Sequence, residues 1–165
     1  MTDTTSSGAP ARLYSQTPYD DRGNFHYQGD LYRPSDNLAT LAGRIEPHLA
    51  RCFPNASFAI QTQKFAGGRK ITAEILDWPE DLTGRDAQEA AQVAIRDQME
   101  RFGTTRTNPL QDFWSCSFYC EARIGQVYWS ALAKRNGLKN PVDAIVSLAA
   151  LDRKSTRLNS SHESP

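Results

Sequence analysis

Residues 57–77 read SFAIQTQKFAGGRKITAEILD, and the central part of the fold is predicted from this segment. Two runs of alternating apolar and polar residues flank a pair of adjacent glycines, a pattern typical of two strands joined by a tight turn. With Gly67 and Gly68 as a two-residue loop, Ile60 faces Ile75 across the hairpin, and one face is apolar while the other is polar. The pattern therefore predicts an antiparallel hairpin with one face against a core, over residues 57–65 and 70–77.

A glycine pair among basic residues also occurs in loops that bind phosphate. Such loops place glycine N–H groups at the start of a helix, followed by a lysine and a hydroxyl residue. Here a strand-like alternation follows the glycines, so we interpret them as a turn. The basic residues at the tip have no acidic neighbour, which suits either phosphate contacts to nucleic acid or an ordinary solvated turn. The candidate nucleic-acid-binding residues are Lys64, Arg69, Lys70 and, beyond the hairpin, Arg85.

Helical spacing of apolar residues predicts helices on both sides of the hairpin. The run DFWSCSFYCEA alternates again and predicts a third strand over residues 113–122 in the same antiparallel sheet, with Trp114 facing the core. The predicted fold class is α+β, a small antiparallel sheet against helices over residues 36–52, 84–102 and 125–136 and a short helix over residues 141–150.

Length and composition suit one globular domain with tails. The chain has 165 residues, 39% hydrophobic residues and a formal net charge of +0, and it has no apolar run of bilayer-spanning length. We therefore expect a cytoplasmic protein that does not contact a membrane. The expected segments are a flexible leader at 1–12, an aromatic arm at 13–34, a single α+β domain at 35–151 and a tail at 152–165.

The tail has a distinct origin in this interpretation. Residues 152–162 read DRKSTRLNSSH, which matches the translation of a common sequencing adaptor. We expect residues 152–165 to be an artefactual, disordered addition and the native chain to continue differently beyond Leu151.

Residues for metal binding or catalysis are sparse. Cys116 and Cys120 on one strand would lie roughly 13 Å apart, too far for two thiolates to share a zinc ion. The acidic group Asp77, Glu80 and Asp81 suits either a metal site or turn and capping roles. No residue is assigned a catalytic, cofactor-binding or metal-binding role, and no cofactor is expected.

One segment has a family resemblance. The residues that match are Phe53-Pro54, Phe58, Ile60, Phe65, Gly67-Gly68 and Ile71, within the stretch from Leu38 to about Leu76. This stretch resembles the large polyvalent protein-associated domain, type 29. The resemblance implies a small accessory domain of bacterial proteins carried by phages, plasmids and other mobile elements, with no defined activity.

Three functions remain open on the sequence alone. The first is a non-catalytic accessory domain of a mobile-element protein that binds DNA or RNA through the basic hairpin tip. The second is a protein–protein interaction module that contacts other domains of a larger polypeptide, with the aromatic arm as its docking segment. The third is a truncated piece of a larger enzyme. The oligomeric state is not indicated by the sequence.

Overall fold

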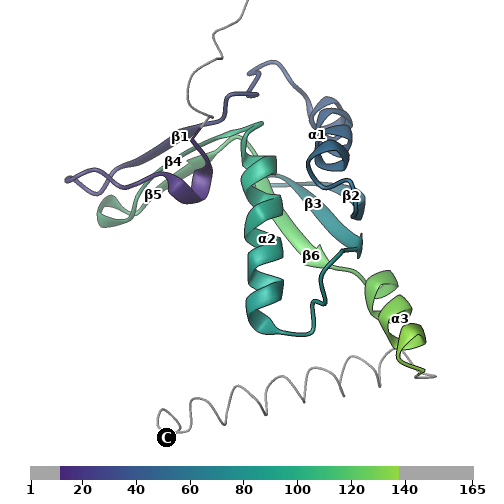
Figure 1. Cartoon of the computed structure of the whole chain (residues 1–165). Coiled ribbons are helices and arrows are strands. Elements are labelled where there is room, and N and C mark those ends of the chain that lie inside the picture. The colour runs from purple at the N-terminus through teal and green to yellow at the C-terminus, as the bar shows by residue number, and fades with distance from the viewer. Residues whose placement is uncertain (1–11, 138–165) are drawn as a thin grey trace, which may run out of the picture.

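The structure, a computed structural model, describes residues 12–137 (Figure 1). The elements that bear on the sequence predictions are three α-helices, six strands and two short 3-10 helices within this range. In chain order they are η1 (Tyr14–Gln16), β1 (Phe25–Gln28), α1 (Leu38–Cys52), β2 (Ser57–Phe65), β3 (Gly68–Asp77), α2 (Arg85–Glu100), β4 (Thr104–Asn108), η2 (Pro109–Gln111), β5 (Phe113–Cys116), β6 (Tyr119–Ile124) and α3 (Gln126–Arg135).

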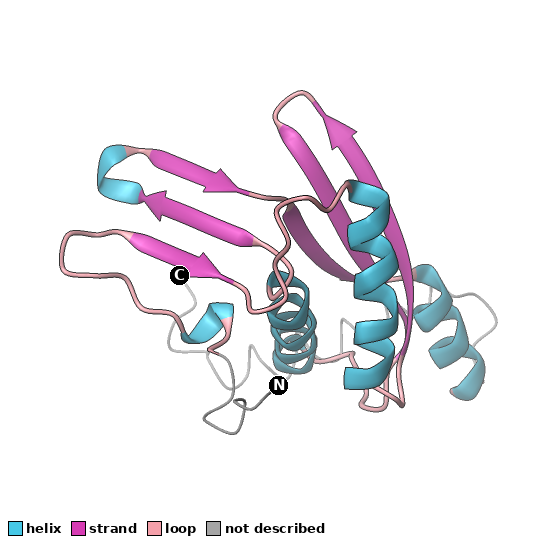
Figure 2. Cartoon of the chain, turned by 90° about the horizontal axis from the view of Figure 1, so that it is seen from above, coloured by secondary structure: helices cyan, strands magenta, loops and turns pink. Residues whose placement is uncertain are grey.

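The strands form two separate sheets of three strands each (Figure 2). The core sheet has the order β2-β3-β6, and the outer sheet has the order β1-β4-β5 and projects to one side of the molecule (Figure 1). The predicted α+β class, with a small sheet against helices, is confirmed. The three predicted helices within the described range are also confirmed, with ends shifted by one or two residues. The predicted helix 141–150 lies outside the described residues.

The hairpin of the core sheet has the predicted faces but a different register. Phe58 pairs with Ile75 and Ile60 with Ala73, so the two-residue loop is Ala66-Gly67 rather than Gly67-Gly68. The pairing differs from the prediction by two residues. Because side chains alternate with a period of two, such a shift leaves every side chain on its predicted face.

The predicted single strand 113–122 is wrong. Its first part is β5 in the outer sheet and its second part is β6, which pairs parallel, not antiparallel, with β3. The chain changes sheets at Ser117, whose N–H donates to the Thr104 carbonyl at 2.9 Å and whose Oγ accepts from the Thr104 N–H at 2.9 Å. These two bonds end the pairing with β4, and Phe118 next enters the core at 3% exposure.

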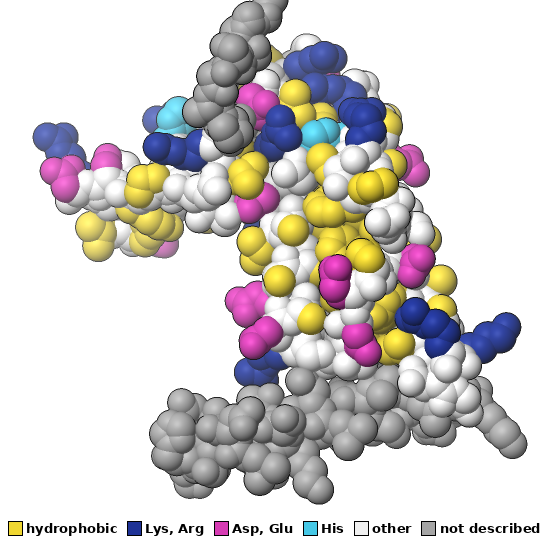
Figure 3. All heavy atoms as spheres, in the orientation of Figure 1, with side chains coloured by type: hydrophobic (Ala, Val, Ile, Leu, Met, Phe, Trp, Pro, Cys, Tyr) yellow, Lys and Arg dark blue, Asp and Glu magenta, His cyan; other side chains and the backbone are white. Residues whose placement is uncertain are grey.

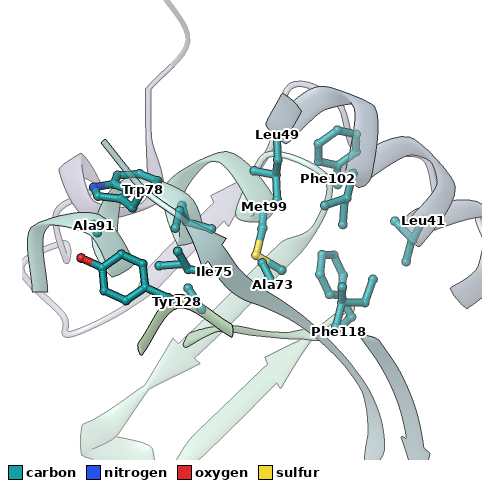
Figure 4. Packing of buried hydrophobic residues seen from close by; sticks show 14 of the residues in the cluster. Leu41, Leu49, Ala73, Ile75, Trp78, Ala91, Met99, Phe102, Phe118 and Tyr128 are labelled. Carbon is teal, nitrogen blue, oxygen red and sulfur yellow. The ribbon is translucent and has the colours of Figure 1, made fainter. Parts of the chain in front are cut away.

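The hydrophobic core lies between the core sheet and the helices (Figure 4). Ile71, Ala73 and Ile75 alternate along β3 and are fully buried, and they meet the apolar stripes of α1 and α2. Both helices therefore cover the same face of the sheet. The apolar helix residues of this core include Leu41, Ile45 and Leu49 of α1 and Ala91, Ile95 and Met99 of α2.

A smaller group of aromatic side chains packs on the outer sheet. Phe25 and Tyr27 of β1 are buried, and the Tyr14 ring of η1 lies edge-on to both, at centroid distances of 5.1 and 5.6 Å. Part of the aromatic arm predicted from the sequence thus forms one strand of this sheet and its apolar cover. Trp114, predicted to face the core, is 51% exposed on β5, because this strand lies at the edge of the outer sheet.

Candidate nucleic-acid interface

The hairpin tip brings three of the four predicted basic residues together. Lys64 and Arg69 pair directly across the two strands, and Lys70 follows on β3. Lys64 is exposed, whereas Lys70 forms an ion pair of 3.3 Å with Glu121. The Arg69 guanidinium donates to the Ser117 carbonyl at 3.0 Å and to the Asp36 carbonyl at 3.3 Å. Only Lys64 of the three is wholly directed to solvent, so the tip is a weaker cationic site than its sequence indicates.

Arg85 does not belong to this cluster. It is the first residue of α2, which follows β3 in the chain, so it lies near the end of β3 remote from the hairpin tip. Ten strand residues correspond to roughly 33 Å at the usual rise. The structure therefore separates Arg85 from the other three predicted residues.

The stronger cationic site is a depression between α1, the loop that precedes it and the end of α2. It has a volume of about 550 Å³ and is called the arginine pocket below. In the view of Figure 3, lysine and arginine side chains gather around a histidine at the upper end of this face. The residues that line the arginine pocket are Leu31, Arg33, Gly43, Arg44, Pro47, His48, Arg51, Arg101 and Phe102.

Two of the four arginines are held by acidic side chains. The Arg101 guanidinium donates to both carboxylate oxygens of Asp30, at 2.9 and 2.8 Å, and Arg44 forms an ion pair with Asp36. The hydrogen bond from Arg101 lowers the pKa of Asp30, and the same bond raises the pKa of Arg101. Arg44 also lies over the Phe102 ring, with 4.9 Å between its guanidinium carbon and the ring centroid. These two guanidinium groups are thus fixed in position before any ligand arrives.

A glycine sets the position of the Asp30–Arg101 pair. The Gly29 N–H donates to the Gly103 carbonyl at 2.9 Å, and a Cβ at Gly29 would lie 2.1 Å from the Arg101 carbonyl oxygen. Only glycine fits at this distance from the backbone of another segment. The close approach places Asp30 beside Arg101, although the two residues are far apart in the sequence.

The other two arginines are the free cations of the pocket. Arg33 and Arg51 are exposed, and neither forms an ion pair with an acid among residues 12–137. His48, between them and the core, is 8% exposed and is hydrogen-bonded to Gln98 at 2.9 Å. Burial lowers the pKa of His48, and the nearby Arg101 and Arg51 lower it further, against the hydrogen bond with Gln98, which raises it.

The arginine pocket and the hairpin tip are neighbours. Asp36 joins them, because its carboxylate pairs with Arg44 of the pocket while its backbone carbonyl accepts from Arg69 of the tip. Together the two sites form one cationic surface around the start of α1.

Sequence reasoning missed this pocket, although one signal was available. Arg44, His48 and Arg51 recur at helical spacing beside the apolar stripe of α1, which places them on one side of that helix. Arg33 and Arg101 come from distant segments and join the group only through the fold.

The remaining candidate chemistry is explained by local structure. Cys116 and Cys120 lie on strands of different sheets and are free, and within residues 12–137 no three His, Cys, Asp or Glu side chains are grouped to bind a metal ion. The Asp81 carboxylate accepts from the Thr83 N–H and hydroxyl, and Asp77 accepts from the Trp78 N–H. Both acids thus have turn roles.

A larger cavity, of about 680 Å³, lies along α2 and adjoins the arginine pocket, because its lining residue Gln98 is hydrogen-bonded to His48 and Arg101. Its lining combines apolar side chains such as Phe53 and Val93 with the acids Asp86, Glu89 and Asp97. Three carboxylates repel a polyanion, so this cavity is not part of the cationic surface.

Comparisons with known proteins give no relatives: no family model, curated protein or solved structure matches this chain. The resemblance of residues 38–76 to a mobile-element accessory domain therefore stays a prediction. None of the helices between residues 12 and 137 has the length and apolar character needed to cross a bilayer.

Proposed function

We propose that this protein is a non-catalytic accessory domain that binds nucleic acid through its phosphate backbone. The binding surface is the arginine pocket together with the adjoining hairpin tip. The association with phages, plasmids or other mobile elements depends on the sequence resemblance alone and is part of the same proposal.

One observation carries the proposal. Four guanidinium groups converge on the arginine pocket, and among residues 12–137 two carboxylates, Asp30 and Asp36, pair with them. The pocket therefore has an excess of positive charge in a chain whose formal net charge is +0. Arginine presents a planar set of N–H donors that matches the oxygens of a phosphate group, and local concentration of such groups attracts a polyanion.

The spacing of the basic side chains suits an extended ligand. Arg44 and Arg51 lie seven residues apart on α1, which corresponds to roughly 10 Å along the helix axis. Lys64 and Arg69 extend the surface beyond the start of the helix. A single phosphate group cannot contact all of these side chains, whereas a nucleic-acid backbone can.

The test removes the free cations without leaving an acid unpaired. Arg33→Ala combined with Arg51→Ala takes away two exposed guanidinium groups that have no ion-pair partner among the described residues. Binding of a fluorescein-labelled oligothymidine is followed by anisotropy over a range of salt concentrations. We expect weaker binding and a decrease of about 1.4 in the steepness of log affinity against log salt, since each phosphate contact to a single strand contributes about 0.7.

A matched control changes the net charge equally at a remote place. Arg22→Ala combined with Arg106→Ala removes two exposed cations associated with the outer sheet. This variant is expected to keep the wild-type affinity and slope. The proposal is wrong if the pocket variant binds as wild type does, or if the control variant weakens binding to the same extent.

A further inference from the structure

Among residues 12–137, the face of the core sheet away from α1 and α2 is mainly polar and is called the open face below. Because Ile71, Ala73 and Ile75 face the helices, the alternate residues of β3 and their partners on β2 and β6 point the other way. The side chains of this open face include Gln61, Gln63 and Phe65 of β2, Lys70, Thr72 and Glu74 of β3, and Tyr119, Glu121 and Arg123 of β6.

Two aromatic rings meet on this face at the hairpin tip. Phe65 and Tyr119 have ring centroids 5.7 Å apart, with an angle of 37° between the ring planes. Gly68 lies between their backbones, and a Cβ there would come within 3.4 Å of the Tyr119 ring and 3.8 Å of the Phe65 ring. These are ordinary van der Waals distances, so both rings lie against the backbone at Gly68.

The ring pair remains open to solvent. Phe65 is 43% exposed and Tyr119 is 37% exposed. An exposed aromatic surface of this kind offers faces on which a flat apolar ligand can stack.

Cations lie on both faces of the hairpin tip beside the ring pair. Lys70 pairs directly with Tyr119 on the same face and is ion-paired with Glu121, whereas Lys64 precedes Phe65 and points to the opposite face. Arg69, between Gly68 and Lys70, directs its guanidinium to the helix side and touches Asp36 of the cationic surface. The rings and the arginine pocket are therefore on the two sides of one hairpin tip.

On the basis of the proposed function, we infer that the Phe65–Tyr119 pair stacks unpaired bases, so that the ligand is single-stranded nucleic acid. The phosphates of the strand lie on Lys64, Lys70 and the arginine pocket, while one or two bases lie on the rings. Duplex nucleic acid keeps its bases stacked on each other and cannot offer their faces to the rings.

The experiment compares two probes that carry the same phosphates. One is a fluorescein-labelled oligothymidine, and the other is an abasic oligomer of equal length with tetrahydrofuran sugars in place of nucleosides. We expect the wild-type chain to bind the oligothymidine roughly tenfold more tightly than the abasic oligomer, because stacking contributes only to the first.

Two double variants separate stacking from apolar cover. Phe65→Leu with Tyr119→Leu keeps an apolar cover over Gly68 but removes the aromatic faces, and we expect it to bind both probes with the wild-type affinity for the abasic oligomer. Phe65→Tyr with Tyr119→Phe exchanges the rings and leaves the composition unchanged, and we expect it to keep the wild-type preference. Thermal melting of both variants checks that each is folded.

The outcomes distinguish this inference from the proposed function. Equal wild-type affinity for the two probes overturns the stacking inference and assigns the rings to a protein contact or to cover for Gly68, while phosphate binding stands. A leucine variant that still prefers the oligothymidine also overturns it. A wild-type chain that binds neither probe overturns the proposed function and this inference together.

Discussion

The core sheet and the outer sheet have three strands each but differ in what covers them. In the core sheet, Ile71, Ala73 and Ile75 are fully buried beneath two helices. In the outer sheet, Phe25 and Tyr27 are buried by the single turn of η1, while β5 exposes Phe113 and Trp114 by 47% and 51%. Equal numbers of strands thus have very unequal amounts of buried apolar surface.

The part of the molecule that stabilises the fold differs from the part proposed to bind nucleic acid. Apolar burial is the main favourable contribution to folding, so the core sheet and its helices dominate the free energy of unfolding. The cationic surface lies where the two parts meet, since Arg101 follows α2 and Asp30 follows β1 of the outer sheet. The outer sheet contributes to the candidate interface chiefly by positioning this pair.

The largest expected effect is a difference in the free energy of unfolding between one alanine variant of each sheet. Ile75→Ala leaves a cavity among the core side chains and should lower the free energy of unfolding by about 2–5 kcal/mol. Trp114→Ala removes a ring that is half exposed and should lower it by less than about 1 kcal/mol. Urea denaturation of both variants measures the two values, and equal losses would contradict the ranking of the sheets.

The second largest expected effect is a pH dependence of stability that comes from Glu100, a buried acid at the end of α2. Glu100 is 6% exposed, and burial raises its pKa from the ordinary 4.5 to about 7, against the opposing influence of Arg96 and Cys120. Between these values the folded chain holds a proton that the unfolded chain releases. The free energy of unfolding should therefore fall as pH rises from 4.5 to 7, by about 3 kcal/mol for this group.

Glu100→Gln isolates this effect from other titrating groups. Glutamine cannot ionise, so the variant should lose the decline and exceed the wild type in stability above pH 7. His48 acts in the opposite sense, since a lowered pKa makes stability increase with pH, and it is present in both proteins. Parallel stability curves for wild type and variant between pH 5 and 8 would show that Glu100 does not carry the dependence.

The smallest expected effect lies within the outer sheet. Among the buried side-chain nitrogen and oxygen atoms of residues 12–137, the Tyr27 hydroxyl oxygen has no hydrogen-bond partner. Burial raises the pKa of Tyr27 to about 12, so the hydroxyl stays neutral at ordinary pH. It therefore forms no ion pair that could offset the missing hydrogen bond. Tyr27→Phe removes an unsatisfied donor and should raise the free energy of unfolding by about 1 kcal/mol, measured by urea denaturation. A loss of stability would mean that the hydroxyl has a partner, such as a bound water.

The sequence was sufficient for the elements whose pattern is local. Alternation placed Ile60 and Ile75 on one face of the hairpin, and the apolar spacing of α1 and α2 located both helices. The exact loop was not predictable from composition. Gly68 has φ of 155°, a conformation that side-chain-bearing residues rarely adopt, and it lies in β3 rather than in the turn.

Features that depend on long-range contacts were not predictable. The alternation from Phe113 to Ala122 continues through Ser117, where the chain passes from one sheet to the other, because both segments are strands with the same period. Likewise, the hairpin tip was predicted as a cationic cluster from neighbouring residues. The arginine pocket depends on Arg33 and Arg101, which no sequence period connects.

The parallel pairing of β3 with β6 has a consequence for biosynthesis. Strand β6 begins roughly forty residues after β3 ends, which takes about 2–8 seconds at ordinary translation rates. A hairpin forms within microseconds, so β2 and β3 wait for most of that interval with one strand edge unpaired. An unpaired edge can template contacts between nascent chains, and this interval is when a chaperone would protect the protein most effectively.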